Sequence, residues 1–171
     1  DLDRVKGLLV SCVANCVRAG LRRVMVHRAD HNLLGQFLSP LSNHRRDQYG
    51  GSPENRRRWP LEVLRAIRET VGPQVAVEIR VSAEEMTQPY CDLIHVSRGI
   101  VYDDSGIYTL PTYLRPRMLN ADYARRVKER VSKPVATVGN FSTLAEAEEL
   151  LASGGADIVC MARAFLADHA L

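Results

Sequence analysis

The sequence predicts an α/β fold in which helices cover a parallel sheet. Short apolar segments typical of buried strands alternate along the chain with longer segments in which apolar residues recur every three or four positions. This alternation favours parallel strands joined by helices. Polar residues and glycines gather directly after the strand segments, at the edge where α/β barrels carry their chemistry. Five strands are predicted, whereas a closed (β/α)8 barrel needs eight and about 250 residues, so we expect part of a barrel.

The predicted helices and strands are distributed along the whole chain, with longer connections around residues 28–52 and 97–118. Helices are expected where the apolar spacing is three or four, and strands where a short apolar run is bounded by turn residues. The expected helices cover residues 1–19, 53–71, 119–131 and 143–153, with a last one from about residue 163. The expected strands cover residues 24–27, 75–81, 93–96, 135–138 and 158–161.

Capping residues mark the starts of the first two helices. Asp1 or Asp3 can cap the first, and Ser52 followed by Pro53 forms a strong start for the second. Pro60 lies inside the second helix, where it removes one backbone hydrogen bond. We therefore expect either a kink at Pro60 or a helix that becomes regular only after it.

Composition indicates an ordinary globular domain with one core of useful size, at 171 residues, 46% hydrophobic and 25% charged. The net charge of +3 argues against a nucleic-acid partner but remains compatible with a phosphate-bearing ligand. No apolar run approaches the roughly 20 residues that span a bilayer, and no signal-peptide pattern is present. We therefore expect no membrane contact and, by default, a cytoplasmic location.

The four cysteines do not form a metal motif. Cys12 and Cys16 lie one helical turn apart on an apolar face, and Cys91 and Cys160 lie at or in predicted strands. We expect buried free thiols and no metal site in the chain.

Residues 36–56 contain the most specific pattern in the chain, and four later segments agree with it in order. The pattern is Gln36-Phe37-Leu38-Ser39-Pro40, then Asn43, Arg45, Asp47, Tyr49-Gly50-Gly51-Ser52 and Glu54-Asn55-Arg56; the later segments are 78–82, 92–97, 134–139 and 157–164. In this order and spacing the chain resembles the Old Yellow Enzyme group of flavin oxidoreductases over nearly its whole length. The closer match is the NADH-dependent branch that includes 2,4-dienoyl-CoA reductases, enoate reductases and bile-acid reductases.

The resemblance implies an FMN-binding (β/α)8 TIM barrel, of which residues 1–171 would form one partial domain with the C-terminal five strands or so. The connection between Val81 and Asp92 is too short for the usual parallel crossover of a dozen or more residues, and the resembled family has a helix there. We therefore expect residues missing from the chain before Asp1 and near positions 87–90. The alternative is a true part-barrel that needs a partner.

The resemblance also implies a reaction. NAD(P)H would reduce FMN, which would then pass a hydride to the activated C=C bond of a small unsaturated substrate, such as an enone, enoate or enoyl thioester. An iron–sulfur cluster and FAD would belong only to regions beyond this chain, and we expect a homo-oligomer. Two alternatives remain open: a non-catalytic barrel subunit that acts as an assembly partner, and a phosphate-binding barrel with non-redox chemistry.

Arg80 is the first candidate cofactor residue, because it lies near the end of a strand between apolar neighbours. The resemblance implies that it contacts the flavin ring near N1 and O2, where a fixed cation stabilises the charge of the reduced ring. The structural alternative is an ion pair with Glu78 or Asp92.

Four further candidates follow the last two strands: Gly139, Asn140, Ala162 and Arg163. These strand ends commonly form a phosphate site in barrels, from backbone N–H groups and a helix N-terminus. The resemblance implies that the ligand is the FMN phosphate. The simpler interpretation is a turn glycine and a solvent-facing arginine.

The catalytic candidates are His27, Asp30 and His31, after the first strand. The resemblance implies that His27 and a His or Asn three residues later bind the substrate carbonyl and so polarise the C=C bond. This chain departs from that pattern, because Asp30 stands at the second position and Asn32 at one that is often aromatic. An ionised Asp30 would repel a developing enolate, and His31 would substitute for it only if the turn shifts by one residue.

Other polar residues are expected to hold the structure together. The stretch that begins at residue 36 and leads into the helix start at Ser52 should be a long polar loop. Arg45, Asp47 and Tyr49 should pin this loop, and the basic run 56–58 should be solvated or form ion pairs within it. Residues 98–120 form a long stretch after a strand, which should cover the site or contact a partner.

Overall fold

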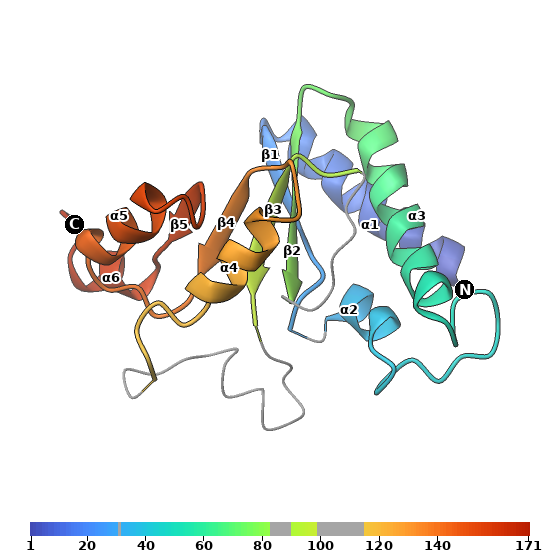
Figure 1. The fold of residues 1–171 in the computed structure, drawn as a ribbon. Coiled ribbons are helices and arrows are strands. Elements are labelled where there is room, and N and C mark those ends of the chain that lie inside the picture. The colour runs from blue at the N-terminus through green and yellow to red at the C-terminus, as the bar shows by residue number, and fades with distance from the viewer. Residues whose placement is uncertain (31, 83–89, 99–114) are drawn as a thin grey trace.

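The computed structural model describes residues 1–30, 32–82, 90–98 and 115–171. Within these ranges the centre of the fold is a five-stranded parallel sheet whose strands lie side by side in chain order (Figure 1). The strands are β1 (Arg23–His27), β2 (Ala76–Ser82), β3 (Leu93–Ser97), β4 (Val135–Val138) and β5 (Ile158–Cys160). Each strand begins and ends within one residue of its predicted position, which confirms the α/β class and the parallel sheet.

Helices flank the sheet along its length. Helices α1 and α3 pack against each other at the β1–β2 end, α4 lies against β3 and β4, and α5 lies against β5 (Figure 1). The helices are α1 (Leu2–Arg18), α2 (Leu33–Leu38), α3 (Pro53–Val71), α4 (Ala121–Lys128), α5 (Leu144–Ala152) and α6 (Arg163–Ala167). All except α2 were predicted.

Helix α2 occupies the start of the stretch that we predicted to be a loop. Its residues Leu34, Phe37 and Leu38 are buried, and the Phe37 ring packs on Trp59 of α3 with 4.4 Å between ring centroids. Six residues are too few for a helical pattern to stand out in a sequence, and such a short helix depends on tertiary packing. The loop itself is therefore residues 39–52.

Helix α3 starts as predicted, because the Ser52 Oγ accepts the backbone N–H of Asn55 (3.3 Å). The helix continues without interruption through Pro60, so the expectation of a helix that becomes regular only after Pro60 is wrong. Burial of Trp59 and its neighbours on the same face outweighs the single missing hydrogen bond. In α1 the Asp1 carboxylate makes no capping bond and instead pairs with Arg4 (3.0 Å).

The apolar core lies between the sheet and helices α3, α4 and α5. Alternate residues of β2, such as Val77 and Ile79, are fully buried in it, together with Leu64 of α3, Ala124 of α4 and Leu150 of α5. Because successive side chains of a strand point to opposite faces of the sheet, the strand residues between these buried ones lie on the other face.

That opposite face carries a row of side chains from every strand. Residues paired across parallel strands point to the same side, and one continuous row of pairs consists of His27, Arg80, His95, Ala136 and Ile158. This arrangement is expected for the inner face of a part-barrel. The short β2–β3 connection includes residues 83–89, so the predicted missing residues near 87–90 lie largely outside the described residues.

Two aspartates tie strands and helices together in the same way. Asp92, just before β3, accepts the backbone N–H of Val77 in β2 (2.8 Å) and pairs with Arg68 of α3. Asp157, just before β5, accepts a backbone N–H of β4 (2.7 Å) and pairs with Lys128 of α4. Each carboxylate therefore joins one strand start to the preceding strand and helix.

The cysteines are free thiols, as predicted, but only Cys91 is buried, and Cys12 is exposed. The prediction of four buried thiols is therefore wrong, because α1 buries none of its residues completely. In the described part of the chain, no three His, Cys, Asp or Glu residues form a group that could hold a metal ion. No helix in the same part is long and apolar enough to cross a membrane.

Replacing Asp157 with Asn should lower the free energy of unfolding by about 1 kcal/mol, because charge-assisted hydrogen bonds to Lys128 and to the β4 backbone are weakened. Urea unfolding followed by circular dichroism measures the change. Asp122→Asn is the matched control, since Asp122 is 81% exposed in its pair with Arg125 and should contribute almost nothing. Equal losses in the two variants would contradict the role given to Asp157.

Candidate functional site

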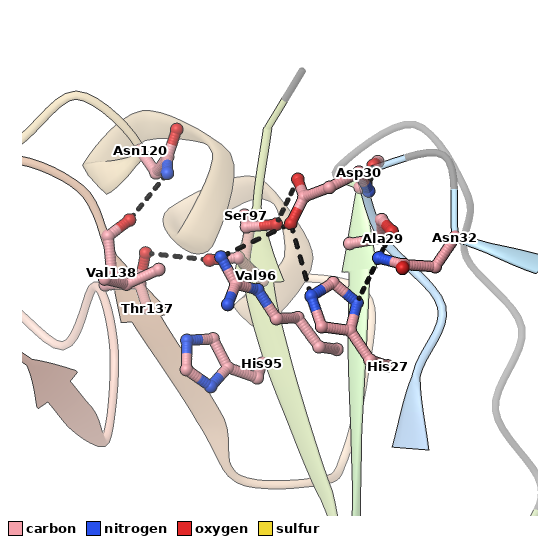
Figure 2. A network of polar contacts seen from close by, with 12 residues as sticks. His27, Ala29, Asp30, Asn32, His95, Val96, Ser97, Asn120, Thr137 and Val138 are labelled. Atoms are coloured by element: carbon pink, nitrogen blue, oxygen red, sulfur yellow. Dashed lines mark hydrogen bonds and ion pairs between the residues drawn. The ribbon is translucent and has the colours of Figure 1, made fainter. Parts of the chain in front are cut away.

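Polar side chains from three neighbouring strands meet at the C-terminal edge of the sheet (Figure 2). His27 ends β1, Arg80 lies near the end of β2, and Ser97 ends β3. His27 and Arg80 are register partners on the inner face. The strand order therefore gathers these side chains where a barrel carries its active site.

Asp30 lies at the centre of this group and is buried, with 8% of its side chain exposed. One carboxylate oxygen lies 3.5 Å from His27 Nε2 and 3.4 Å from Arg80 Nη2, and the other accepts a hydrogen bond from Ser97 Oγ (3.2 Å). The Asp30 N–H donates to Ser82 Oγ (3.4 Å). Its backbone is left-handed, with φ of +58°, a conformation that Asp tolerates better than most residues. The turn thus directs the carboxylate inward, between β1 and β2.

His27 is half-exposed, at 39% of its side chain, and is held from two sides. Asn32 Nδ2 lies 3.1 Å from His27 Nδ1, while Asp30 approaches Nε2 (Figure 2). Burial and the nearby positive charge of Arg80 lower the pKa of His27, and Asp30 opposes this only in part. The imidazole is therefore neutral at neutral pH.

Arg80 does not pair with Glu78 or Asp92, the two partners that the sequence suggested. Glu78 pairs instead with His95 (2.7 Å) and more distantly with Arg23 (3.6 Å), and Asp92 pairs with Arg68. Arg80 has Asp30 as its partner, because the turn after β1 brings that carboxylate over the end of β2.

On the inner face, two buried polar atoms have no hydrogen-bond partner within the part of the chain that the structure describes. These are Arg80 Nε, a donor, and His95 Nε2. Burial lowers the pKa of His95, opposed by the hydrogen bond of its Nδ1 with Glu78. Unpaired polar groups in a buried position are costly, so this face is suited to a polar ligand that would pair with them.

The candidates from the last two strands lie around one cavity of about 280 Å³. It is lined by Val138, Asn140, Phe141, Ser142, Cys160, Met161, Ala162, Arg163, Ala164 and Ala167. Asn140, Ala162 and Arg163 are therefore neighbours, and Gly139 adjoins them in the chain. The cavity opens at the same C-terminal edge as Arg80, since all the strands are parallel.

Gly139 and Asn140 also shape the backbone at this edge. Gly139 has φ of +147°, and a Cβ there would lie 2.8 Å from Asn120 Nδ2. Asn120 donates to the Val138 carbonyl (2.5 Å; Figure 2), and Asn140 Nδ2 donates to the Arg115 carbonyl (2.8 Å). The Asn140 side chain therefore anchors the segment before α4, a role that we did not predict.

A capping box at the start of α5 stabilises the neighbouring part of the same C-terminal edge. Glu146 accepts two hydrogen bonds from Arg117 (2.8 and 2.6 Å) and the backbone N–H groups of Ser142 and Thr143, while Thr143 Oγ1 accepts the Glu146 N–H. The Arg117 guanidinium, with these N–H groups, lowers the pKa of Glu146 to about 2. The start of α5 and the segment before α4 are thereby fastened together.

The loop of residues 39–52 is held by its own side chains, as predicted. Arg45 pairs with Asp47, whose carboxylate also accepts the N–H of Tyr49 (3.0 Å). Arg56 Nε donates to the carbonyl at the end of α2 (2.7 Å). These residues stabilise the loop.

Sequence reasoning treated Asn32 only as a departure from the resembled pattern, and it missed other residues of the site: Ser82, Ser97, Asn120 and the pair of Arg117 with Glu146. Ser82 and Ser97 carried a usable signal, because each is a polar residue at the end of a buried strand. The predicted candidate His31 lies outside the described residues, as does most of the stretch 98–120 that we expected to cover the site.

One protein family matches nearly the whole chain: the NADH:flavin oxidoreductase / NADH oxidase family, over residues 5–171. The chain is 35% identical to an NADH oxidase of Thermoanaerobacter brockii, over 98% of this chain and 28% of that protein. It is 36% identical to an NADPH dehydrogenase of Bacillus pumilus, over 98% of this chain and 53% of that protein. The chain thus spans about half the length of these relatives or less.

Two solved structures are also similar to this chain over nearly its whole length. Histamine dehydrogenase from Rhizobium sp. 4-9 superposes with a TM-score of 0.86 at 27% identity, over 98% of this chain and 26% of that one. Morphinone reductase superposes with a TM-score of 0.73 at 27% identity, over 97% of this chain and 46% of that one. The five-stranded sheet is therefore part of a (β/α)8 TIM barrel.

The lowered pKa of Glu146 predicts a pH dependence of stability. A carboxylate with a folded pKa of about 2 and an ordinary value of 4.5 stabilises the fold above about pH 4.5, and this contribution is lost as the pH falls toward 2. Over that window the free energy of unfolding should decrease more steeply in the wild type than in Glu146→Gln, which carries no charge at any pH.

Urea unfolding at several pH values across this window measures the difference. Glu69→Gln, which removes an exposed pair with Arg65, should follow the wild-type pH dependence. Parallel curves for the wild type and Glu146→Gln would contradict the role of the capping box.

Proposed function

The chain belongs to the NADH:flavin oxidoreductase / NADH oxidase family, and from this premise we propose that the protein binds FMN and reduces an activated C=C bond of a small unsaturated molecule, with NAD(P)H as reductant. The names of two relatives, NADPH dehydrogenase and morphinone reductase, support the reductant and the direction of the reaction. The names of the relatives do not favour the alternative of a non-catalytic assembly partner.

One observation carries this proposal: Arg80 and the cavity at the ends of β4 and β5 share one edge of the parallel sheet. The residues there fit FMN, because Arg80 Nε is a buried donor with no partner among the described residues and Arg163 contributes a cation to the cavity. Arg80 would lie beside the flavin ring, while Arg163 and the backbone at Gly139 and Ala162 would hold the phosphate. When bound, FMN supplies the centre that accepts and returns a hydride.

We assign to His27 the role of binding the substrate carbonyl. It is neutral and half-exposed, so its N–H can donate to a substrate carbonyl and draw electron density from the C=C bond. Asp30 acts against this step, because a carboxylate repels the negative charge that develops on the carbonyl oxygen. Arg80, at 3.4 Å from Asp30, offsets part of that repulsion.

Asp30 also favours a second candidate function, the oxidation of an amine. A buried carboxylate beside the substrate group is suited to bind an ammonium ion, and one structural relative is named histamine dehydrogenase. That reaction would need the ammonium to lose one proton, for which the Asp30 carboxylate is a nearby acceptor, and the neutral amine could then give up a hydride from its adjacent carbon to FMN and become an iminium ion.

FMN binding tests the shared premise of both candidates. The purified protein should be yellow, and Arg163→Ala should weaken FMN affinity about tenfold, because it removes a charge-assisted contact worth about 1.4 kcal/mol. Fluorescence titration with FMN measures the affinity. Arg130→Ala, which removes an exposed arginine just after α4, should leave it unchanged. A colourless protein that does not bind FMN would contradict the proposed cofactor.

Asp30→Asn separates the two candidate functions. For an enone, kcat/KM should rise about tenfold, because the amide removes a repulsive charge and adds a donor for the carbonyl oxygen. For an amine, kcat/KM should fall about tenfold or more, because the ammonium loses its partner. Assays of NAD(P)H-dependent enone reduction and of dye-coupled amine oxidation measure both, with Asp122→Asn as control. Loss of both activities would contradict both assignments of Asp30.

A further inference from the structure

Asn32 stands at the N-cap position of α2 but does not cap the helix with its side chain. Its Nδ2 lies 2.9 Å from the Ala29 carbonyl oxygen and 3.1 Å from His27 Nδ1. A carbonyl oxygen only accepts hydrogen bonds, so the amide atom that faces Ala29 must be the nitrogen. The same nitrogen has a second hydrogen, which is directed at His27.

The direction of this contact determines where His27 carries its proton. Because Asn32 donates to it, Nδ1 must be an acceptor, and a neutral imidazole then holds its proton on Nε2. Nε2 lies 3.5 Å from the Asp30 carboxylate, which only accepts when ionised. The two neighbours of the ring therefore favour the same tautomer, one from each side (Figure 2).

The titratable and charged groups around His27 lie in or directly after three neighbouring strands. Asp30, after β1, favours the protonated ring, whereas Arg80 on β2 and His95 on β3 disfavour it, as does burial. The pKa of His27 is lowered as the net result. The doubly protonated ring, in which Nδ1 would also be a donor and would clash with the Asn32 amide, is therefore disfavoured.

We propose that Asn32 is a positioning residue that holds His27 as a neutral imidazole with its proton on Nε2. The inference rests on the proposed function only for its consequence: in that reaction a substrate carbonyl would compete with Asp30, 3.5 Å away, for the Nε2 proton. An Nδ1-protonated His27 would present a lone pair at Nε2 and could donate to neither.

Long-range proton–nitrogen NMR correlation on ¹⁵N-labelled protein tests this, with the His27 signals assigned by their loss in His27→Gln. In the wild type, Nδ1 should be unprotonated and Nε2 protonated. In Asn32→Leu, which removes the donor without changing charge, a measurable fraction of Nδ1 should gain a proton. In Asn32→Asp, the new carboxylate should raise the pKa of His27 by about one unit or more.

Asn15→Leu makes the same exchange on the exposed surface of α1 and should leave the His27 signals unchanged. The Asn32 backbone N–H also donates to the Ala29 carbonyl (3.1 Å), so the turn keeps one hydrogen bond in both variants at position 32, and circular dichroism checks that they fold. A proton on Nδ1 in the wild type, or wild-type signals in both Asn32 variants, would overturn the proposal.

Activity measurements distinguish this result from the proposed function. If enone reduction occurs, Asn32→Leu should lower its kcat/KM about tenfold while FMN affinity stays at the wild-type value. The predicted tautomer change without any enone reduction would refute the proposed function and support the positioning role. Enone reduction that is unaffected by Asn32→Leu would refute the positioning role alone.

Discussion

The turn after β1 brings the Asp30 carboxylate between His27 and Arg80, and this contact organises the C-terminal edge of the sheet. The parallel register has already set His27 and Arg80 side by side on the inner face. The left-handed backbone at Asp30 then directs its carboxylate inward, where Ser97 donates to it (3.2 Å). Residues of three strands thus form one connected unit, which ties the position of His27 to that of Arg80.

The charges of this unit bear directly on the chemistry of the site. A carbonyl substrate gains negative charge on its oxygen during reduction, so it needs donors such as the neutral His27 and cations such as Arg80. An amine substrate carries positive charge and needs an acceptor such as Asp30. Because both kinds of group lie within 3.5 Å of each other, the two proposed functions make opposite demands on the residue at position 30.

The contacts that hold the strand ends in place lie mostly outside the group formed by Asp30 and its partners. Asp92 and Asp157 each join a strand start to the preceding strand and helix, which maintains the register that aligns the strand ends. Glu146 fastens the start of α5 to the segment before α4 through Arg117. That segment places Asn120 beside Gly139, so the edge at β4 is shaped by contacts within the chain.

Local sequence patterns were sufficient to predict the five strands, the longer helices and the strand-end positions of Arg80 and Arg163, because apolar spacing and turn residues act over a few positions. They did not predict α2, which depends on the packing of Phe37 on α3, nor the partners of Asp30 and Asn140. Ser97 lies 67 residues from Asp30 along the chain, and no short-range pattern encodes such a contact. Strand positions therefore follow from local apolar patterns, whereas the hydrogen-bond partners at the strand ends are set only when the folded sheet brings distant segments together.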